Sequence, residues 1–238
     1  MKERDPRPIL VTGGSSDIGR AIIHRLLEAD QSVVSQCRSV PQDLPSGPNI
    51  EWKTADLSND AGVSGFLDEV AERGSGFQGF IHCAGVIEGV EWKTVETAQM
   101  ENTFWVNAFS FFMIARALFD KMEKNNGGRL IALSSIGVKF AGSSHSTIYS
   151  ASKRALEGFA MSLSRQGAAK GILSNVIRVG VTDTRIHRVP GKVMEARKEM
   201  IPLKRMASPD EIAGATMFLL GPDAAFITGA IIPVSGGE

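Results

Sequence analysis

The chain has little cysteine, almost no tyrosine and no excess of charge of either sign. Its 238 residues include two cysteines, one tyrosine, and 26 basic against 26 acidic side chains, with an isoelectric point of about 6.9. Two cysteines do not make a disulfide framework, so we expect Cys37 and Cys83 to be reduced thiols. The balanced charge argues against a nucleic-acid scaffold or a membrane-surface binder and favours a small-molecule partner.

Long hydrophobic runs are also absent. No apolar stretch approaches the ~18 residues that a membrane-spanning helix needs, and the N-terminal MKERDPRP is charged, broken by proline and followed by no apolar segment. We therefore expect a cytoplasmic protein without a membrane anchor. The hydrophobic content of 43% is typical of a packed globular chain, and the length suits a single domain over residues 1–238.

Short runs rich in β-branched residues alternate with longer stretches of helical period, which predicts the α/β class with a parallel sheet. Residues 39–49 hold too much proline and glycine for a helix, so one crossover should be a bare loop. The expected helices begin near Ile18, Asp60, Thr97, Tyr149 and Ser208. The seven expected strands are Ile9–Thr12, Ser32–Gln36, Ile50–Thr54, Gly79–His82, Arg129–Leu133, Ser174–Val179 and Ala230–Val234.

A glycine-rich turn follows the first expected strand. The segment Gly13-Gly14-Ser15-Ser16-Asp17-Ile18-Gly19 leads into a stretch of helical period. Free backbone N–H groups and the positive end of a helix dipole at such a turn suit a pyrophosphate. A tight strand-to-helix turn without a ligand is the alternative, and the loop alone does not decide between the two.

Tyr149, the only tyrosine, precedes Lys153 by four residues. On a helix the two side chains share one face. We expect a nearby ammonium to stabilise the phenolate and lower the pKa of Tyr149, which makes the phenol a usable acid and base near neutral pH. The alternative is coincidence, since a lysine follows a given tyrosine at this spacing in about one case in twenty.

The glycine loop and the Tyr149–Lys153 pair together resemble the motifs of the classical short-chain dehydrogenase/reductase family, and the resemblance runs from Ile9 to Gly237. Within that family the pattern is most similar to 3-oxoacyl carrier-protein reductases. The resemblance implies a Rossmann-type, doubly wound, three-layer fold, with helices on both faces of a seven-stranded parallel sheet. It also implies an enzyme that uses a nicotinamide dinucleotide.

A catalytic set of Asn107, Ser135, Tyr149 and Lys153 is what the resemblance implies. Tyr149 would donate a proton to a carbonyl oxygen that Ser135 holds, Lys153 would hold the nicotinamide ribose, and Asn107 would link a proton relay to Lys153. Each residue also has a structural alternative: a buried amide for Asn107, a strand-end hydroxyl for Ser135 and a solvated cation for Lys153. Ser135 and Tyr149 lie 14 residues apart, one more than is usual in the family, so Ser134 is a second, weaker candidate.

Cofactor preference depends on the end of the second strand. No acid stands there to hold a ribose 2′-hydroxyl, and Cys37 occupies its position. Arg38 with Ser39 would suit a 2′-phosphate, so we expect NADP(H) rather than NAD(H), although Arg38 could be an ordinary surface cation. The cofactor-binding residues implied by the resemblance are Gly13, Ser15, Ser16, Ile18, Gly19, Arg38, Asp56, Leu57, Ala84, Gly85, Tyr149, Lys153, Gly180 and Thr184.

Several positions depart from the family pattern. Asp17 replaces a glycine of the loop, where its carboxylate would repel a pyrophosphate or cap the following helix. His82 and Cys83 replace a pair of asparagines, and Val179 replaces a proline. No ligand-spaced acids or cysteines accompany His82, so we expect a hydrogen-bonded structural role for it and no metal site. These departures leave open a catalytically weak, cofactor-binding regulator.

Residues 184–206 would, by the resemblance, form a flap over the substrate. This segment has a surplus of basic residues, which favours an acidic or phosphorylated partner, with solvated side chains as the alternative. Arg129 and Lys170 fall near positions where the family's 3-oxoacyl reductases dock their acidic carrier. The basic residues of the segment are Arg185, Arg188, Lys192, Arg197, Lys198, Lys204 and Arg205, against Glu195 and Glu199.

We therefore expect an NADPH-dependent oxidoreductase that reduces a ketone, first of all a 3-oxoacyl thioester, to a secondary alcohol. The substrate would be a small or carrier-linked carbonyl compound, and a sugar, polyol, steroid or other secondary alcohol is the alternative within enzymes. The apolar content of residues 100–122 and 149–170 would leave exposed faces in a monomer, so we expect a homotetramer or homodimer.

Overall fold

The computed structural model describes residues 5–41, 43–71, 76–185 and 194–238, and within them seven parallel strands form one sheet. The strand order is β3-β2-β1-β4-β5-β6-β7, so the direction of winding reverses between β1 and β4. This is the doubly wound sheet that the sequence predicted. The strands are β1 (Ile9–Thr12), β2 (Val33–Cys37), β3 (Ile50–Thr54), β4 (Gly79–His82), β5 (Gly128–Ser135), β6 (Ile172–Val179) and β7 (Ile231–Val234).

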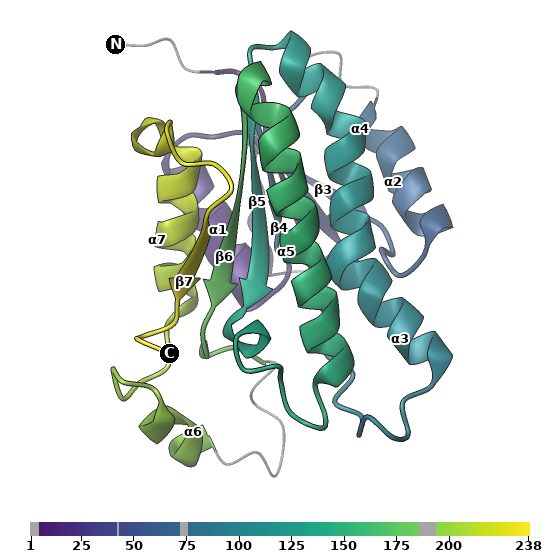
Figure 1. Ribbon diagram of the computed structural model, residues 1–238. Coiled ribbons are helices and arrows are strands. Elements are labelled where there is room, and N and C mark those ends of the chain that lie inside the picture. The colour runs from purple at the N-terminus through teal and green to yellow at the C-terminus, as the bar shows by residue number, and fades with distance from the viewer. Residues whose placement is uncertain (1–4, 42, 72–75, 186–193) are drawn as a thin grey trace.

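Helices cover both faces of the sheet and give the expected three layers (Figure 1). One face carries α1 (Asp17–Glu28) and α7 (Pro209–Leu220), and the other carries α2 (Asp60–Ala71), α4 (Ser110–Lys124) and α5 (Thr147–Gly167). The short helix α6 (Met194–Met200) lies beyond the carboxyl ends of the strands (Figure 1). The remaining elements are α3 (Thr97–Phe104), a π-helical segment (Trp105–Phe109) and 3₁₀ turns at Ile136–Val138, Ala168–Lys170 and Pro222–Ala224.

Two hydrophobic cores lie on opposite faces of the sheet. Leu10 and Leu130 point toward α2, α4 and α5, while their neighbours Val11 and Ile131 point toward α1 and α7. Successive side chains of a strand alternate between the two faces, and both faces here are covered by helices. That is why the strands read in the sequence as continuous apolar runs rather than as alternating ones.

Most boundaries agree with the sequence prediction, and the differences have local causes. Residues 39–49 contain no helix in their described part, as expected. Helix α5 begins at Thr147 rather than Tyr149, and β5 continues to Ser135. The π-helical segment and α6 were not predicted, because neither changes the hydrophobic period enough to be seen. Part of the expected flap, residues 186–193, lies outside the described residues.

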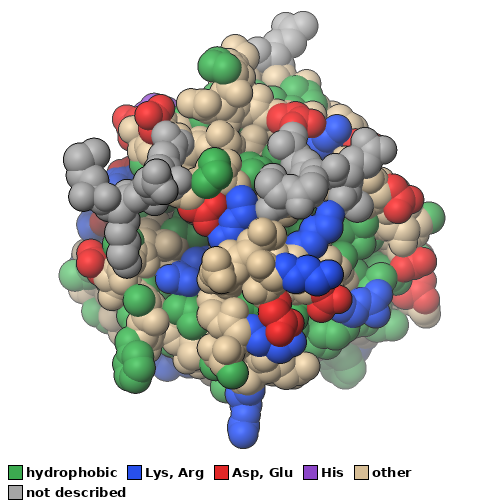
Figure 2. Space-filling model, turned by 90° about the horizontal axis from the view of Figure 1, so that it is seen from above, with side chains coloured by type: hydrophobic (Ala, Val, Ile, Leu, Met, Phe, Trp, Pro, Cys, Tyr) green, Lys and Arg blue, Asp and Glu red, His purple; other side chains and the backbone are tan. Residues whose placement is uncertain are grey.

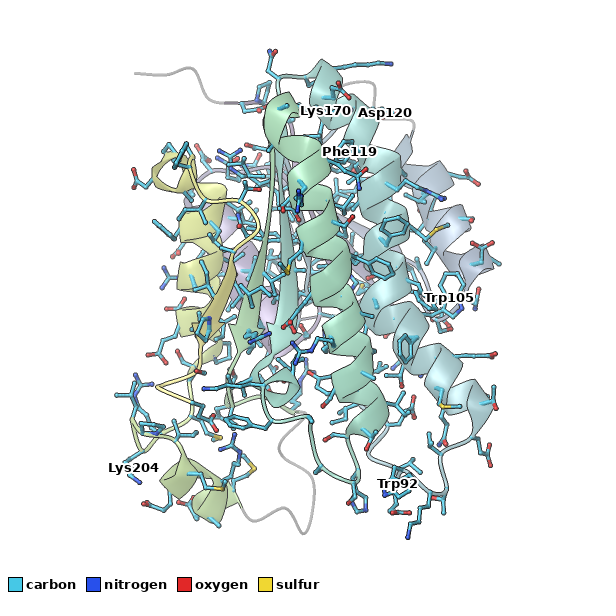
Figure 3. The ribbon with its side chains drawn as sticks, viewed as in Figure 1. Trp92, Trp105, Phe119, Asp120, Lys170 and Lys204 are labelled. Atoms are coloured by element: carbon cyan, nitrogen blue, oxygen red, sulfur yellow. The ribbon has the colours of Figure 1, made fainter. Side chains whose placement is uncertain are left out.

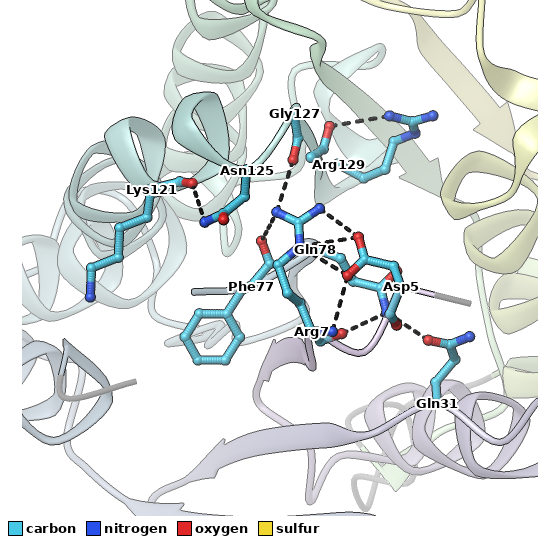
Figure 4. A network of polar contacts seen from close by, with 10 residues as sticks. Asp5, Arg7, Gln31, Phe77, Gln78, Lys121, Asn125, Gly127 and Arg129 are labelled. Atoms are coloured by element: carbon cyan, nitrogen blue, oxygen red, sulfur yellow. Dashed lines mark hydrogen bonds and ion pairs between the residues drawn. The ribbon is translucent and has the colours of Figure 1, made fainter. Parts of the chain in front are cut away.

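The N-terminal segment is attached to the end of the sheet at which the strands begin (Figure 4). The Arg7 guanidinium contacts Asp5 at 2.5–3.0 Å and donates to the carbonyls of Phe77 and Gly127 at 3.5 and 3.2 Å. Gln78 donates to the Arg7 carbonyl at 2.7 Å. These contacts join the segments that precede β1, β4 and β5, so they fix the sheet at the end opposite to its carboxyl edge.

The surface and the thiols fit the composition. Lys and Arg side chains lie beside Asp and Glu over the visible described face in Figure 2, rather than in one patch of a single sign. Cys37 and Cys83 are free thiols, as expected. Among the described helices, none combines the length and the apolar character that crossing a bilayer requires.

Helix α5 is held on the sheet by a buried carboxylate. Glu157 is only 2% exposed, and its two oxygens accept hydrogen bonds from Nε and Nη2 of Arg178, both at 2.7 Å. Ser134 at the end of β5 donates to the same carboxylate at 2.8 Å. Because Arg178 lies on β6, this cluster joins α5 to two strands and fixes the orientation of the helix.

Replacing Glu157 with alanine should lower the free energy of unfolding by about 3 kcal/mol, because the Arg178 cation would lose its buried partner. Urea denaturation at pH 7 measures this change. The matched control is Glu123→Ala, which breaks an exposed ion pair with Lys170 at 2.6 Å and should cost less than about 1 kcal/mol. Equal losses in the two variants would show that the buried cluster does not anchor α5.

Candidate active site

The predicted functional residues gather at the carboxyl ends of the strands, around a cavity of about 450 Å³. In open α/β sheets, ligands bind outside these ends, at the point where the winding reverses. Here that point lies between β1 and β4. Eight of the predicted catalytic and cofactor-binding residues line the cavity: Ser16, Ile18, Gly85, Ser135, Tyr149, Lys153, Gly180 and Thr184.

The glycine loop between β1 and α1 is shaped by close backbone approach. Gly13 has a φ of +69°, and a Cβ atom there would lie 2.6 Å from the backbone of Ala84. Gln36 accepts a hydrogen bond from the Gly13 N–H at 3.0 Å. Ser16 caps α1, since its hydroxyl accepts from the N–H of Gly19 at 3.1 Å. The loop therefore brings β1, β2 and β4 together at the edge of the cavity.

Asp17 does not cap the helix, contrary to one expectation. The capping position belongs to Ser16, which has extended backbone geometry, while Asp17 is already the first helical residue. Its carboxylate instead accepts from the backbone N–H of Arg185 at 2.7 Å and lies 3.0 Å from Nε of the same arginine. Asp17 is thus paired with a cation from the start of the expected flap.

Lys153 is a buried cation and not a solvated one, so its structural alternative is wrong. The side chain is 4% exposed, and Nζ donates to the Leu133 carbonyl at 2.8 Å. Burial lowers the pKa of Lys153 to about 8. A Cβ atom at Gly85 would lie 3.3 Å from Nζ and 3.5 Å from Oδ1 of Asn107. Glycine at this position therefore leaves room beside the ammonium.

Asn107 lies in the π-helical segment and is fully buried. Its amide accepts from the Val86 N–H at 2.8 Å and donates to the Val86 carbonyl and to Ser152 Oγ, both at 2.9 Å. This is the contact pattern of the structural alternative, a satisfied buried amide. The amide clamps the chain after Gly85 against α5, so Asn107 positions the walls around Lys153.

His82 supports the same π-helical segment. The N–H of Ser110 bonds to Trp105, five residues back, which leaves the Val106 carbonyl without its usual helical partner. His82 Nε2 donates to that carbonyl at 3.2 Å, so Nδ1 accepts from the Thr12 hydroxyl at 2.9 Å. Burial, together with the nearby charge of Lys153, lowers the pKa of His82 to about 3, so the ring is neutral. These contacts are those of the expected structural role.

Tyr149 and Ser135 are neighbours on the wall of the cavity. Burial raises the pKa of Tyr149 above its ordinary value, and a hydrogen bond with Ser135 lowers it by less. The expectation that Lys153 lowers this pKa is wrong in direction, because Nζ lies 6.0 Å from the ring centroid and is directed at the Leu133 carbonyl. The hydroxyl of Ser134, the second candidate, donates its hydrogen bond to the Glu157 carboxylate instead. Ser135 is therefore the serine that contacts Tyr149.

The other predicted cofactor residues lie around the cavity rather than on its walls. Arg38 is exposed directly after β2, and Asp56 is exposed after β3, where its carboxylate accepts from the Ser58 N–H at 3.0 Å. Leu57 is buried beside it. Residues that shape the surrounding loops without lining the cavity are Gly13, Ser15, Gly19, Ala84 and Asn107.

Some cavity residues had not been predicted. Ile136 and Gly137 directly follow Ser135 at the end of β5. Because ligands bind outside the carboxyl ends of parallel strands, their position after the strand could have predicted them. No signal marks Ser146 or Ser150, because isolated serines are common in any loop or helix. Ile87 and Val181 likewise line the cavity without a sequence signal.

The basic surplus of the flap is mostly neutralised within the chain. Its described cations each contact a carboxylate, in the pairs Arg185–Asp17, Arg197–Glu238, Lys198–Glu195, Lys204–Glu199 and Arg205–Glu211. Arg188 and Lys192 lie outside the described residues. The described part of the flap therefore offers no set of unpaired cations. Its basic surplus does not support the expected acidic partner.

Arg129 and Lys170 do not border the cavity. Arg129 is the second residue of β5 and Ser135 is the last, which separates them by about 20 Å along the strand. Lys170 pairs with Glu123 and lies at the opposite end of the molecule from Trp92 and Lys204 (Figure 3). A carrier docked on these two side chains would therefore contact the opposite end of the sheet from the cavity.

A doubly wound sheet with a glycine loop, and with a serine, a tyrosine and a buried lysine on one cavity at the carboxyl ends of its strands, defines a dinucleotide-dependent oxidoreductase. A family model described as enoyl-(acyl carrier protein) reductase matches residues 14–238. An acetoacetyl-CoA reductase from Allochromatium vinosum is 34% identical over 97% of this chain and 98% of the relative. The chain belongs to the short-chain dehydrogenase/reductase family.

Further relatives and solved structures agree with this assignment. A 3-oxoacyl-(acyl-carrier-protein) reductase from Aquifex aeolicus is 28% identical over 96% of this chain and 95% of the relative. The Pseudomonas aeruginosa RhlG/NADP active-site complex has a TM-score of 0.87 at 28% identity, over 97% of this chain and 95% of that one. A blue fluorescent protein from a metagenomic library, in complex with NADPH, has a TM-score of 0.86 at 27% identity, over 97% of both chains.

Replacing Lys153 with methionine should raise the free energy of unfolding at pH 7 by about 2 kcal/mol, because burial of the charged ammonium destabilises the fold. The folded-state pKa of about 8 lies below the ordinary 10.5. The cost is therefore complete below pH 8 and decreases as the pH rises from 8 toward 10.5.

Urea denaturation between pH 6 and about pH 10 measures this effect, and the advantage of Lys153→Met should shrink over the upper part of that range. Lys170→Met is the control, since Lys170 is exposed and paired with Glu123. A stability difference that does not change with pH would contradict a lowered pKa for Lys153.

Proposed function

We propose that this chain is an NADPH-dependent reductase that converts the 3-oxo group of an acyl thioester to a secondary alcohol. The observation that carries the proposal is the placement of Ser135, Tyr149 and Lys153 on one cavity, beside a glycine loop. Relatives named as acetoacetyl-CoA and 3-oxoacyl-carrier reductases support this substrate class.

The residues present fit a dinucleotide. Gly13 and Gly85 stand where a side chain would collide with the backbone of Ala84 or crowd Lys153, so the loop and the ammonium remain accessible. Lys153, Tyr149 and Thr184 would hold the nicotinamide half, and Arg38 would hold the 2′-phosphate. When bound, the cofactor supplies a hydride to the carbonyl carbon.

The proton comes from Tyr149. Because burial raises its pKa, the phenol keeps its proton at neutral pH and can give it to the carbonyl oxygen as negative charge develops there. The Ser135 hydroxyl donates a hydrogen bond to the same oxygen and orients the substrate. Lys153 Nζ lies 6.0 Å from the centroid of the Tyr149 ring, so the residue that would hold the nicotinamide ribose stands beside the proton donor.

The lining of the cavity favours an acyl substrate over a sugar. Ile87, Ile136, Val179 and Val181 contribute apolar surface next to Ser135 and Tyr149, which suits an aliphatic chain better than a polyhydroxylated ring. Steroids and other secondary alcohols remain the second candidate class for the same reason.

Self-association would cover the apolar side of α4 and α5. Phe109 is 37% exposed and Met161 is 45% exposed. Phe112 and Phe159 stack between the two helices, with ring centroids 4.8 Å apart. We include a homodimer or homotetramer built on this face in the proposal, since an exposed cluster of this kind is otherwise costly.

Purified protein should oxidise NADPH with acetoacetyl-CoA and longer 3-oxoacyl thioesters, and Tyr149→Phe should lose at least about a thousandfold in kcat, because the change removes the proposed proton donor. The loss of NADPH absorbance measures the rate. Calorimetry should give the variant an NADPH Kd within about threefold of the parent.

Crotonyl-CoA, keto-sugars and cyclic ketones complete the substrate panel. If crotonyl-CoA were the only compound of the panel to be turned over, the reaction would be reduction of a carbon–carbon double bond and not of a ketone. NADPH binding without turnover of any compound would instead support a cofactor-binding regulator.

Arg38→Ala should weaken NADPH binding about tenfold and change NADH binding by less than about twofold, because only NADPH carries the 2′-phosphate. Calorimetric titration of both cofactors checks the difference. A parallel loss for the two cofactors would contradict this role, and tighter binding of NADH by the parent would contradict the cofactor assignment itself.

A further inference from the structure

Asp17 places a carboxylate on the glycine loop, at the first residue of α1. The amino end of a helix attracts a carboxylate and a phosphate alike, so Asp17 competes with a pyrophosphate for the same positive potential. Asp17 lines the cavity together with Ser16 and Ile18. Without a cation beside it, this side chain would repel the dinucleotide that the proposed function requires.

Arg185 supplies that cation from a distant part of the chain. Its backbone N–H donates to Asp17 Oδ2 at 2.7 Å, and its Nε lies 3.0 Å from Oδ1. Its Nη2 donates to the Ser15 carbonyl at 2.7 Å. The guanidinium is therefore held across the glycine loop. It also lines the cavity, next to Thr184.

A second ion pair balances the other side of the loop. Arg20 Nε donates to the same Ser15 carbonyl at 3.1 Å, and its two Nη atoms contact Asp43 at 2.7 and 3.0 Å. The hydrogen bond from Arg20 is the main cause of the lowered pKa of Asp43, and the charge of Arg185 adds a smaller effect. Two cations and two carboxylates thus surround one carbonyl of the loop.

Arg185 still has donors for a ligand. A guanidinium carries five N–H groups, more than the acceptors on Asp17 and Ser15 use. Arginine also matches the geometry of phosphate oxygens better than a point charge does. The Arg185 side chain is 61% exposed and lines the cavity, so a ligand there can reach it.

We propose that Arg185 is a cofactor-binding residue, which neutralises Asp17 and donates hydrogen bonds to the pyrophosphate of NADP(H). The inference rests on the proposed function for the identity of the dinucleotide. It explains how a loop with a carboxylate in place of glycine binds a pyrophosphate. It also makes the first residue after Thr184 part of the cofactor site.

A double-mutant cycle tests the coupling between the two residues, with NADPH Kd from calorimetry as the readout. Arg185→Ala should weaken NADPH binding about tenfold in the parent, since Asp17 is then unpaired. In the D17G background the same change should cost only about twofold to threefold. Equal costs in both backgrounds, or no cost in either, would overturn the proposal.

Cofactor fragments locate the contact. ADP-ribose 2′-phosphate contains the pyrophosphate, whereas adenosine 2′-monophosphate does not. Arg185→Ala should weaken the first about tenfold and leave the second within about twofold. Equal weakening of both fragments would place the effect at the adenosine end and overturn the assignment.

Arg25→Ala is the charge-matched control. Arg25 also lies on α1, but it pairs with Asp210 of α7 at 2.5 Å, away from the cavity, and its loss should change the NADPH Kd by less than about twofold. A parent protein that binds neither NADPH nor NADH would refute the proposed function. A parent that binds NADPH while Arg185→Ala binds it equally well would refute the role of Arg185 alone.

Discussion

The burial of the Lys153 ammonium is the constraint on which the rest of the site depends. A cation removed from water must be offset by dipoles or charges, and here the Leu133 carbonyl at the end of β5 provides the contact. Glycine at position 85 leaves space beside the ammonium, because a Cβ atom there would lie 3.3 Å from Nζ. Burial and the nearby charge of Lys153 lower the pKa of His82 to about 3, so its ring adds no second positive charge. Strand ends, glycine and neutral imidazole are thus arranged around one positive charge.

Two departures from the family pattern, His82 and Asp17, are compensated by contacts elsewhere in the chain. His82 stands where an asparagine is usual, and it joins Thr12 on β1 to the Val106 carbonyl, which the π-helical segment deprives of the Ser110 N–H and which also accepts from the Ser110 hydroxyl. Asp17 stands where a glycine is usual, and Arg185 neutralises it. A substitution that would weaken the framework or repel a ligand is therefore accompanied by a partner that restores the local hydrogen bonding or charge.

The sequence predicted the strands, their parallel arrangement and the residues around the cavity, because strand ends and motif spacing are local signals. It could not predict contacts between distant segments. Asp17 and Arg185 are 168 positions apart, and nothing local marks them as a pair. The direction of the Tyr149 pKa shift could not be predicted either, since it depends on burial outweighing the hydrogen bond with Ser135. The basic residues of the flap suggested a binding surface. Their acidic partners could not be identified from the sequence, because some of them are distant along the chain.

Lys153 and Glu157 illustrate how packing overrides a local rule and thereby serves the chemistry. They are four residues apart on α5, a spacing at which opposite charges often pair, although lysine before glutamate is the weaker order. In the structure both oxygens of Glu157 instead accept from Arg178 on β6, and Nζ of Lys153 is directed at the Leu133 carbonyl. A direct pair with Glu157 would neutralise the ammonium and hold it away from the cavity. By giving the carboxylate another cation, the fold anchors α5 and keeps the charge of Lys153 available beneath Tyr149.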